Sequence, residues 1–439
     1  MNRAEFFVDN ADLVTHSEVV LRPDPGRSLV RPFTPSDPPA YADPHYSRPQ
    51  RIADRVLALG ESEVCAGLDR LTRAIAGSPK KIEDYLLRRF DELNGVLIDR
   101  CSVSDPRKQL LAAYFCAEYS FEAAALFNPS IIPHPAGATL PDGRVRLLLS
   151  LRGVGEGHVS SVTFREGSWS PTHGFEIDEA EDRGIMLQLA TIDGDGDDAI
   201  THLASAGDTP ISQTVIFPIT PSQRQGIEDM RLVLFTDDDG QRKIYGTYTA
   251  YDGRDARPEL MHSTDLKTFS LRKLKGRYAD GKGMAIFPRK IAGRYVMLSR
   301  QDNENIWLLT SDDIRQWNDG HQLITPEQPW EFVQLGNCGS PIEIDEGWLV
   351  LTHGVGVVRS YAIGACLLAK DDPSKVIGRM AAPLLRPTPE GAREGYVPNV
   401  IYSCGGMVHE RTLLLPYGVA DSITRFATVP IDALLRAMD

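Results

Sequence analysis

The sequence predicts a mostly β protein, of the propeller type, preceded by a helical extension. Three observations support this fold class. After Pro129, short β-rich runs alternate with Gly, Asp and Asn, which is typical of a sandwich, a barrel or a propeller. A short motif recurs in this part of the chain at the spacing expected of propeller blades. The residues before Pro129 instead combine a proline-rich segment with apolar positions at helical spacing.

Length, composition and charge indicate an ordinary globular protein. The chain has 439 residues, of which 42% are hydrophobic and 24% are charged, so it can bury a sizeable core. Its net charge of −13 argues against nucleic acid and against anionic membranes as partners. Any site for an anion must therefore be a local basic pocket in an acidic protein.

The cysteines and the N-terminus bear on location. The six cysteines include no CxxC pair, so neither a zinc ribbon nor a dense disulfide framework is predicted. Polar residues (Glu5, Asp9, Asn10 and Asp12) interrupt the first segment, which is therefore not expected to be a secretory signal. No window reaches the ~20 apolar residues that span a bilayer. We expect a cytoplasmic protein without a membrane partner.

The first part of the chain is expected to form an arm and then helices. Residues 22–50 contain eight prolines, a density that blocks helix interiors and central strands. Two amphipathic helices are expected between about 52 and 95, the second capped by Ser78-Pro79. A third apolar run, 110–127, is expected to stay helical until Asn128-Pro129. We place an extension at 1–115 and a catalytic β domain at 116–439.

A repeated motif favours a propeller among the all-β folds. Residues 264–269 and 312–317 share the order acid, aliphatic, basic, polar, aromatic, and 371–374 is a weaker third copy. A spacing of roughly 45–60 residues suits a four-stranded blade, although chance turn chemistry is the alternative. The expected strands are 145–151, 158–164, 232–235, 244–250, 295–299, 306–309, 348–351, 362–368 and 412–416.

The most informative chemical pattern is an acid in a strand-like run, Asp229 in Glu228-Asp229-Met230-Arg231, followed by cationic and aromatic groups at later strand ends. Cleavage of a glycosidic bond usually takes two carboxylates. Phosphate is already a nucleophilic anion, so an enzyme that uses it needs one proton donor and cations that hold phosphate in line. A surface ion pair between Asp229 and Arg231 is the alternative interpretation.

These segments closely resemble glycoside hydrolase family 130, the β-mannoside phosphorylases and related β-1,2-mannosidases, from about Tyr114 to the C-terminus. The matching motifs are 226–231, 282–290, 353–356, 395–399 and 417–421. The resemblance implies a five-bladed β-propeller and a glycosyltransferase of the phosphorylase type. It would be an inverting enzyme of carbohydrate metabolism that releases α-mannose 1-phosphate from a β-mannoside. Met230 departs from the family, in which proline is common at this position.

The resemblance also assigns the site residues. Asp229 would be the proton donor, acting through a substrate hydroxyl. Phosphate would be bound by Lys282, His353, Tyr361, Arg300, Arg231 and Arg289. The mannose subsite would be lined by Asn128, Arg152, Glu228 and Asp421. Taken singly, each of these is more often a solvated charge, a turn residue or a satisfied core group, so their joint presence carries the prediction.

No cofactor and no metal are expected, with inorganic phosphate as co-substrate. The acidic run 193–198 lacks the bidentate glutamate of a calcium loop, and no helix pattern follows the glycine-rich 152–157. The expected partners are a β-mannosyl oligosaccharide and phosphate. A homo-oligomer, the linkage (1,2 or 1,4) and the acceptor sugar are left open.

Two other functions are compatible with the sequence. A β-mannosidase acting on β-1,2-linked mannosides would use the same donor with water, and would need a second carboxylate. The candidates for that carboxylate are Glu228, Asp302, Glu304 and Glu394. A non-catalytic carbohydrate-binding propeller would keep Asn128 and Arg152 but would need no donor acid.

Overall fold

A computed structural model describes residues 10–43, 45–74, 79–93, 103–137, 139–140, 142–388 and 395–438. Ser78, Cys101 and Glu394 lie outside these described residues. The chain forms two compact units. One, which we call the helical unit, comprises 26–120 and 181–186; the other, the β unit, comprises the remaining described residues. The division expected from the sequence, 1–115 and 116–439, stays a prediction, and the units differ from it by placing the N-terminal strand in the β unit.

The helical unit contains α1 (Arg48–Leu57), α2 (Glu61–Ala74), α3 (Pro79–Glu92) and α4 (Asp105–Ala113), with the strand pair β2 (Leu29–Pro32) and β3 (Cys116–Tyr119) and the short β8 (Ile185–Met186). Ser47 caps α1, accepting a hydrogen bond from the Gln50 amide. Apolar side chains from all four helices form its core. The sequence predicted only two helices between about 52 and 95, where the structure has α1, α2 and α3.

The predicted continuation of a helix through 110–127 is wrong. Helix α4 ends at Ala113, and Cys116–Tyr119 pairs with β2 in register from Leu29↔Tyr119 to Pro32↔Cys116. Long-range strand pairing overrides the local helical pattern here, as tertiary context often does.

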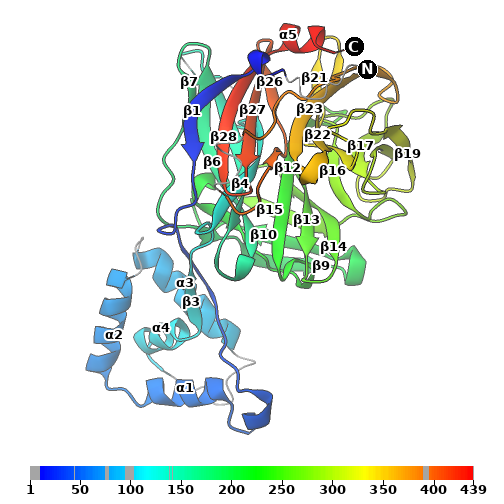
Figure 1. Cartoon of the computed structure of the whole chain (residues 1–439). Coiled ribbons are helices and arrows are strands. Elements are labelled where there is room, and N and C mark those ends of the chain that lie inside the picture. Colours follow the sequence, from blue (N-terminus) through cyan, green and yellow to red (C-terminus); the bar gives the residue numbers. More distant parts are fainter. Residues whose placement is uncertain are drawn as a thin grey trace. The chain divides into compact units, whose positions relative to one another are not determined.

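The β unit consists of antiparallel sheets (Figure 1). One hydrogen-bonded path runs through β4 (Ala125–Pro133), β5 (Val145–Val154), β6 (Ser160–Ser170), β12 (Gly226–Thr236), β13 (Arg242–Tyr251), β14 (Ala256–Ser263), β15 (Thr268–Lys273), β10 (Ile200–Ala204) and β9 (Gln188–Asp193). Strands β7 (Gly174–Ile177) and β11 (Thr214–Ile216) also pair with β6. Strand β12 meets β6 only at the parallel pair Gly226↔Ser160.

Three further sheets complete the β unit. The first contains β16 (Lys282–Ile286), β17 (Tyr295–Arg300), β18 (Ile306–Ser311) and β19 (Asp319–Ile324). The second contains β20 (Gln334–Asn337), β21 (Ile342–Ile344), β22 (Gly347–Val355), β23 (Tyr361–Leu368) and β24 (Val376–Arg379). The third contains β25 (Ile401–Tyr402), β26 (Met407–His409), β27 (Thr412–Val419), β28 (Ile423–Pro430) and β1 (Thr15–Leu21), and helix α5 (Ile431–Arg436) follows it.

The N-terminal strand β1 joins the sheet of C-terminal strands. It pairs antiparallel with β28 from Thr15↔Thr428 to Leu21↔Thr424, and Figure 1 shows the blue β1 beside the red β28. This strand was not among those predicted, because 15–21 (THSEVVL) lacks a strong alternation of apolar and polar residues.

The mostly β class is confirmed, and each predicted strand coincides with or overlaps an observed one. The repeated motif is a turn held by an aspartate. Asp265 Oδ1 accepts from the amides of Lys267 and Thr268 at 2.8 and 2.7 Å, and Asp313 Oδ1 accepts from the Arg315 amide at 2.9 Å. Each turn ends in a buried aromatic ring, Phe269 or Trp317.

The turn chemistry and the buried ring therefore explain why the motif recurs. None of the helices in the described residues is long and apolar enough to cross a membrane.

Candidate active site

Asp229 lies at a β-bulge near the start of β12. The register with β13 shifts between Glu228 and Arg231, and Asp229 has a φ of +53°. In a regular strand, neighbouring side chains point to opposite faces. The bulge instead lets both acids contact one guanidinium: Arg152 donates to Glu228 Oε1 at 2.8 Å and to Asp229 Oδ1 at 3.3 Å.

Asn128 reaches the same acid from a second bulge. The register of β4 and β5 shifts between Phe127 and Ser130, and Asn128 has a φ of +48°. Its Nδ2 donates to Asp229 Oδ1 at 2.7 Å. Asp421, with a φ of +50°, occupies the turn between β27 and β28. Left-handed conformations at non-glycine residues are uncommon and concentrate at functional sites, so three in one cluster support a binding role.

Arg231 follows the β-bulge and contacts the backbone of Asp229. It is buried, and its guanidinium donates to the carbonyls of Cys338 and Asp229 at 2.8 and 3.0 Å and to the Tyr402 hydroxyl at 2.7 Å. These bonds fix Arg231 against the backbone. Arg231 therefore lies behind the acid, and its contact with phosphate stays a prediction.

Lys282 and Arg300 are cross-strand partners in β16 and β17. Lys282 Nζ lies 3.0 Å from Glu228 Oε2, and Arg300 Nη1 lies 3.0 Å from His353 Nε2. The Tyr361 ring stacks on His353 with 6.2 Å between centroids and 11° between planes. Lys282, Arg300, His353 and Tyr361 are thus brought together as the sequence predicted.

His353, which the resemblance assigns to phosphate, is not a cationic group in the structure. Its Nε2 faces two donors, Arg300 Nη1 at 3.0 Å and Gln334 Nε2 at 3.3 Å, so Nε2 must accept and Nδ1 carries the proton. Burial, and then the charge of Arg300, hold the pKa of His353 well below its usual value. The histidine is therefore neutral at physiological pH, and the positive charges near it belong to Lys282 and Arg300.

Arg289 is not brought to the cluster. It follows the end of β16 opposite Lys282, donates to both carboxylate oxygens of Glu343 at 2.9 and 2.8 Å, and lies over the Trp348 ring at 4.9 Å. The structure therefore does not support the phosphate contact that the resemblance implied for Arg289. The residue belongs to the matching segment 282–290, but its guanidinium is paired with Glu343, away from the cluster.

The carboxyls of the cluster have opposite pKa shifts. Burial raises the pKa of Asp229, but the charges of Arg152 and Arg231 and the Asn128 hydrogen bond outweigh burial, and the pKa lies below its usual value. Burial, and then the negative charge of Asp229, raise the pKa of Asp421 to about 6. Asp229 is therefore ionised at neutral pH while no ligand is bound.

Several buried polar atoms of the cluster have no hydrogen-bond partner within the part of the chain that the structure describes. They are Asn128 Oδ1, Arg152 Nε, Arg300 Nε and Asn337 Oδ1. Most buried polar groups in native proteins are paired, so such a concentration indicates a ligand site.

The acids proposed for the hydrolytic alternative are placed as follows. Glu228 is held between Arg152 and Lys282. Asp302 accepts from Asn305 and Trp307 side chains, and although burial opposes them, these and backbone bonds lower its pKa to about 2. Glu304 is exposed in the same turn, and Glu394 lies outside the described residues. Glu228 and Asp302 are thus already bonded to other side chains, whereas Glu304 stays a candidate for the second carboxylate of a mannosidase.

Gln334 and Tyr402 were missed by the sequence analysis. Both are neutral, and neither stands in a motif of charged residues. Gln334 binds His353, and Tyr402 binds Arg231 and packs edge-on against His353 with 4.9 Å between centroids. Only the folded strands bring them to the cluster.

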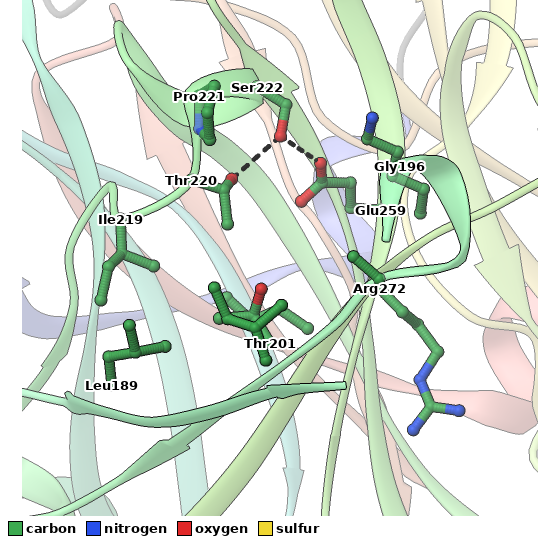
Figure 2. Close-up of a pocket in the computed structure, with 13 residues that line it drawn as sticks. Leu189, Gly196, Thr201, Ile219, Thr220, Pro221, Ser222, Glu259 and Arg272 are labelled. Carbon is green, nitrogen blue, oxygen red and sulfur yellow. Dashed lines mark hydrogen bonds between the residues drawn. The ribbon is translucent and has the colours of Figure 1, made fainter. Parts of the chain in front are cut away.

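A separate cavity of about 260 Å³ lies against the outer strands β9 and β10 (Figure 2). Its lining is mainly apolar, including Leu189 and Ile219. Its one acid, Glu259, already accepts from Ser222, Gln223 and Tyr248 at 2.6 to 2.9 Å. The cavity shares no residue with the Asp229 cluster. Among the described residues, no group of three His, Cys, Asp or Glu side chains could hold a metal ion.

The cluster thus combines an acid with an amide, guanidinium groups and a lysine at bulged strands of a β protein, as a site for a polar ligand would. Comparison with known proteins agrees. The family model described as beta-1,4-mannooligosaccharide phosphorylase matches residues 208–439. This chain therefore belongs to glycoside hydrolase family 130.

Individual relatives are similar over part of the chain. A 1,2-beta-oligomannan phosphorylase of Thermoanaerobacter sp. (strain X514) is 37% identical over 210 residues, which cover 46% of this chain and 68% of that protein. A beta-1,2-mannobiose phosphorylase of Listeria innocua is 29% identical over 233 residues, covering 51% and 63%. The chain thus spans about two thirds of the length of these relatives.

The fold is also similar to that of solved structures. A glycosyl hydrolase from Bacteroides ovatus superposes with a TM-score of 0.51 at 18% identity, covering 71% of this chain and 86% of that one. At this identity the likeness concerns the fold alone.

We predict that Asp421→Asn stabilises the protein above neutral pH. The folded state keeps the Asp421 proton up to about pH 6, whereas the unfolded chain loses it near 3.8, so this group lowers stability as the pH rises through that window. The amide cannot ionise. The unfolding free energy of the variant should exceed that of the wild type by on the order of 2 kcal/mol near pH 8 and by almost nothing near pH 3.5. Urea denaturation at both pH values measures this, and an equal difference at both would contradict it.

Proposed function

We propose that this chain is an inverting β-mannoside phosphorylase, which cleaves a β-mannosyl linkage with inorganic phosphate and yields α-mannose 1-phosphate. One observation carries the proposal. The half-buried acid Asp229 accepts from Asn128 and Arg152. Arg152 also binds Glu228, which pairs with Lys282, the cross-strand partner of Arg300. Such an arrangement suits a proton donor with an anionic nucleophile.

The matched relatives support the reaction type. Those reported above are named as phosphorylases of β-mannosyl oligosaccharides. We propose phosphate as the co-substrate of this chain, without a further cofactor, and a β-mannosyl oligosaccharide as its donor. We also propose a cytoplasmic location and, from the proline-rich segment and the helical spacing, an N-terminal helical extension at 1–115 before a catalytic domain at 116–439.

Phosphate binding would prepare the acid for its role. Asp229 is ionised without a ligand, because Arg152 and Arg231 lower its pKa. A phosphate dianion beside Lys282 and Arg300 brings negative charge into the cluster, and negative charge nearby raises a carboxyl pKa. Asp229 would then hold its proton at neutral pH and pass it through a substrate hydroxyl to the leaving oxygen.

The bond changes balance within this site. A phosphate oxygen forms a bond to the anomeric carbon as the bond from that carbon to the leaving oxygen breaks. Attack from the face opposite the leaving group converts the β configuration to α. The proton that Asp229 gives to the leaving oxygen is replaced by the proton of the hydrogen phosphate, so the acid is restored after each turnover.

We further propose that the β unit is a five-bladed propeller. Two separate sheets, β16 to β19 and β20 to β24, support it, since each holds a run of sequential antiparallel strands as a blade does. The addition of β1 to the C-terminal sheet also supports it, because propellers often close by pairing the two ends of the chain. The resemblance to family 130 implies the number five.

A mannosidase is the second candidate, and the exposed Glu304 is the observation that favours it, since its turn follows Arg300 at the end of β17. Incubation of the protein with β-1,2- and β-1,4-mannobiose, with and without phosphate, separates the two. Phosphorolysis predicts rapid cleavage only with phosphate. Free mannose at equal rates without phosphate supports the mannosidase, and binding without any cleavage supports a carbohydrate-binding module.

A further inference from the structure

An exposed pair of aromatic rings lies beyond the cluster. The rings of His158 and Tyr396 are tilted by 35° with 5.3 Å between centroids, and 69% of Tyr396 is exposed to solvent. His158 is exposed as well. The two rings therefore present an aromatic surface to the solvent.

Both rings are held by the turns that carry the mannose-side residues. His158 belongs to the tight turn between β5 and β6, has a φ of +58°, and follows Arg152 of the same hairpin. Next to Tyr396, the Val397 amide donates to the Ala420 carbonyl at 3.0 Å, one residue before Asp421. A Cβ at Gly395 would come within 2.4 Å of Ala420, so this segment packs tightly on the Asp421 turn.

The pair and the cations are carried by different segments. Lys282 and Arg300 are cross-strand partners in β16 and β17, whereas His158 belongs to the turn between β5 and β6 and Tyr396 lies next to the Asp421 turn. A chain of contacts leads from His353 to Tyr402, from Tyr402 to Arg231, and from Arg231 to the Asp229 carbonyl. It continues from Asp229 to Arg152, in the hairpin of His158. Arg300, which is paired with His353, is therefore several contacts away from the hairpin of His158, whereas Lys282 meets Arg152 through Glu228.

In-line displacement fixes where the leaving sugar goes. The nucleophile and the leaving oxygen lie on opposite sides of the anomeric carbon, so an acceptor sugar must lie away from the phosphate. The C–H faces of pyranose rings pack on aromatic rings. We propose that His158 and Tyr396 form a stacking subsite for the acceptor sugar of a β-mannoside. This inference rests on the proposed function.

Synthesis from α-mannose 1-phosphate and an acceptor separates the two sides of the site. In Tyr396→Ala the KM for a mannose or mannobiose acceptor should rise roughly 3- to 10-fold, because stacking contacts of this kind are lost. The KM for α-mannose 1-phosphate should stay within about twofold, since that ligand has no sugar in the proposed acceptor subsite. Tyr396→Phe, which keeps the ring, should retain the wild-type acceptor KM. Tyr41→Ala, which removes a 79%-exposed tyrosine of the helical unit, is the matched control.

An unchanged acceptor KM in Tyr396→Ala, or an equal rise of both KM values, overturns the proposal. If the wild type makes no sugar phosphate, the phosphorylase function fails, yet calorimetric binding of β-1,2-mannotriose still tests the subsite. A Kd that is 3- to 10-fold weaker in Tyr396→Ala and unchanged in Tyr396→Phe supports it, and equal Kd values in all three proteins reject it. Thermal unfolding of each variant shows that it is folded.

Discussion

Asp229→Asn should lower the turnover number by at least ~10²-fold, the usual effect of losing a general acid. Asparagine keeps the shape of the side chain, and its oxygen can still accept from Asn128 and Arg152, which hold Asp229 Oδ1 at 2.7 and 3.3 Å. What the variant lacks is the titratable proton. Binding of a β-mannoside should therefore change much less than turnover, and calorimetry with kinetics on one protein sample measures both.

The matched control is Asp208→Asn, which removes a carboxylate whose side chain is 97% exposed. Its turnover should equal that of the wild type. Near-normal turnover in Asp229→Asn would show that another group donates the proton. Loss of sugar binding together with turnover would instead indicate that the acid binds substrate and does no acid catalysis.

The second large effect concerns phosphate. Lys282→Ala removes a charge-assisted hydrogen bond, typically worth ~1.5–3 kcal/mol, so the apparent KM for phosphate should rise roughly 10- to 150-fold. Arg300→Ala should act in the same direction, because Arg300 pairs with Lys282 across the strands and its Nε lacks a partner. The KM for the mannoside should change much less. Initial rates over a matrix of phosphate and mannoside concentrations give both constants.

Lys267→Ala is the control for loss of a lysine charge, since Lys267 is solvent-exposed and its side chain pairs with the exposed Asp208. It should leave the phosphate KM unchanged. An unaltered phosphate KM in both Lys282→Ala and Arg300→Ala would place the anion elsewhere. A comparable rise in the mannoside KM would show that Lys282 acts chiefly through Glu228, to which it is bound at 3.0 Å.

Much of the β unit could be predicted from local sequence. Its strands are short runs of apolar and β-branched residues bounded by turn residues, and the repeated turns are fixed by single aspartates. The errors arose where distant segments decide the structure. Residues 116–119 form β3 because β2 is available to pair with them, and 15–21 form β1 because β28 offers an edge.

In the site, too, local motifs could be predicted from the sequence and contacts between distant strands could not. Asp229, Asn128, Arg152 and Lys282 were identified from motifs, and the structure brings them together. The β-bulge that directs Glu228 and Asp229 toward one arginine could not be predicted from the alternation of apolar and polar residues along the strand. Nor could sequence reveal that Nε2 of His353 accepts two hydrogen bonds and is uncharged, because its donors, Arg300 and Gln334, come from other strands.

The origin of the oxygen on the anomeric carbon tests the central claim most directly. The protein is incubated with β-1,2-mannobiose and ordinary phosphate in water enriched in heavy oxygen, and the sugar products are analysed by mass spectrometry. Phosphorolysis predicts mannose 1-phosphate of α configuration without heavy oxygen, because the new bond to carbon comes from phosphate. Two molecules of free mannose for each mannobiose, formed as fast without phosphate as with it and without mannose 1-phosphate, would contradict the proposed function.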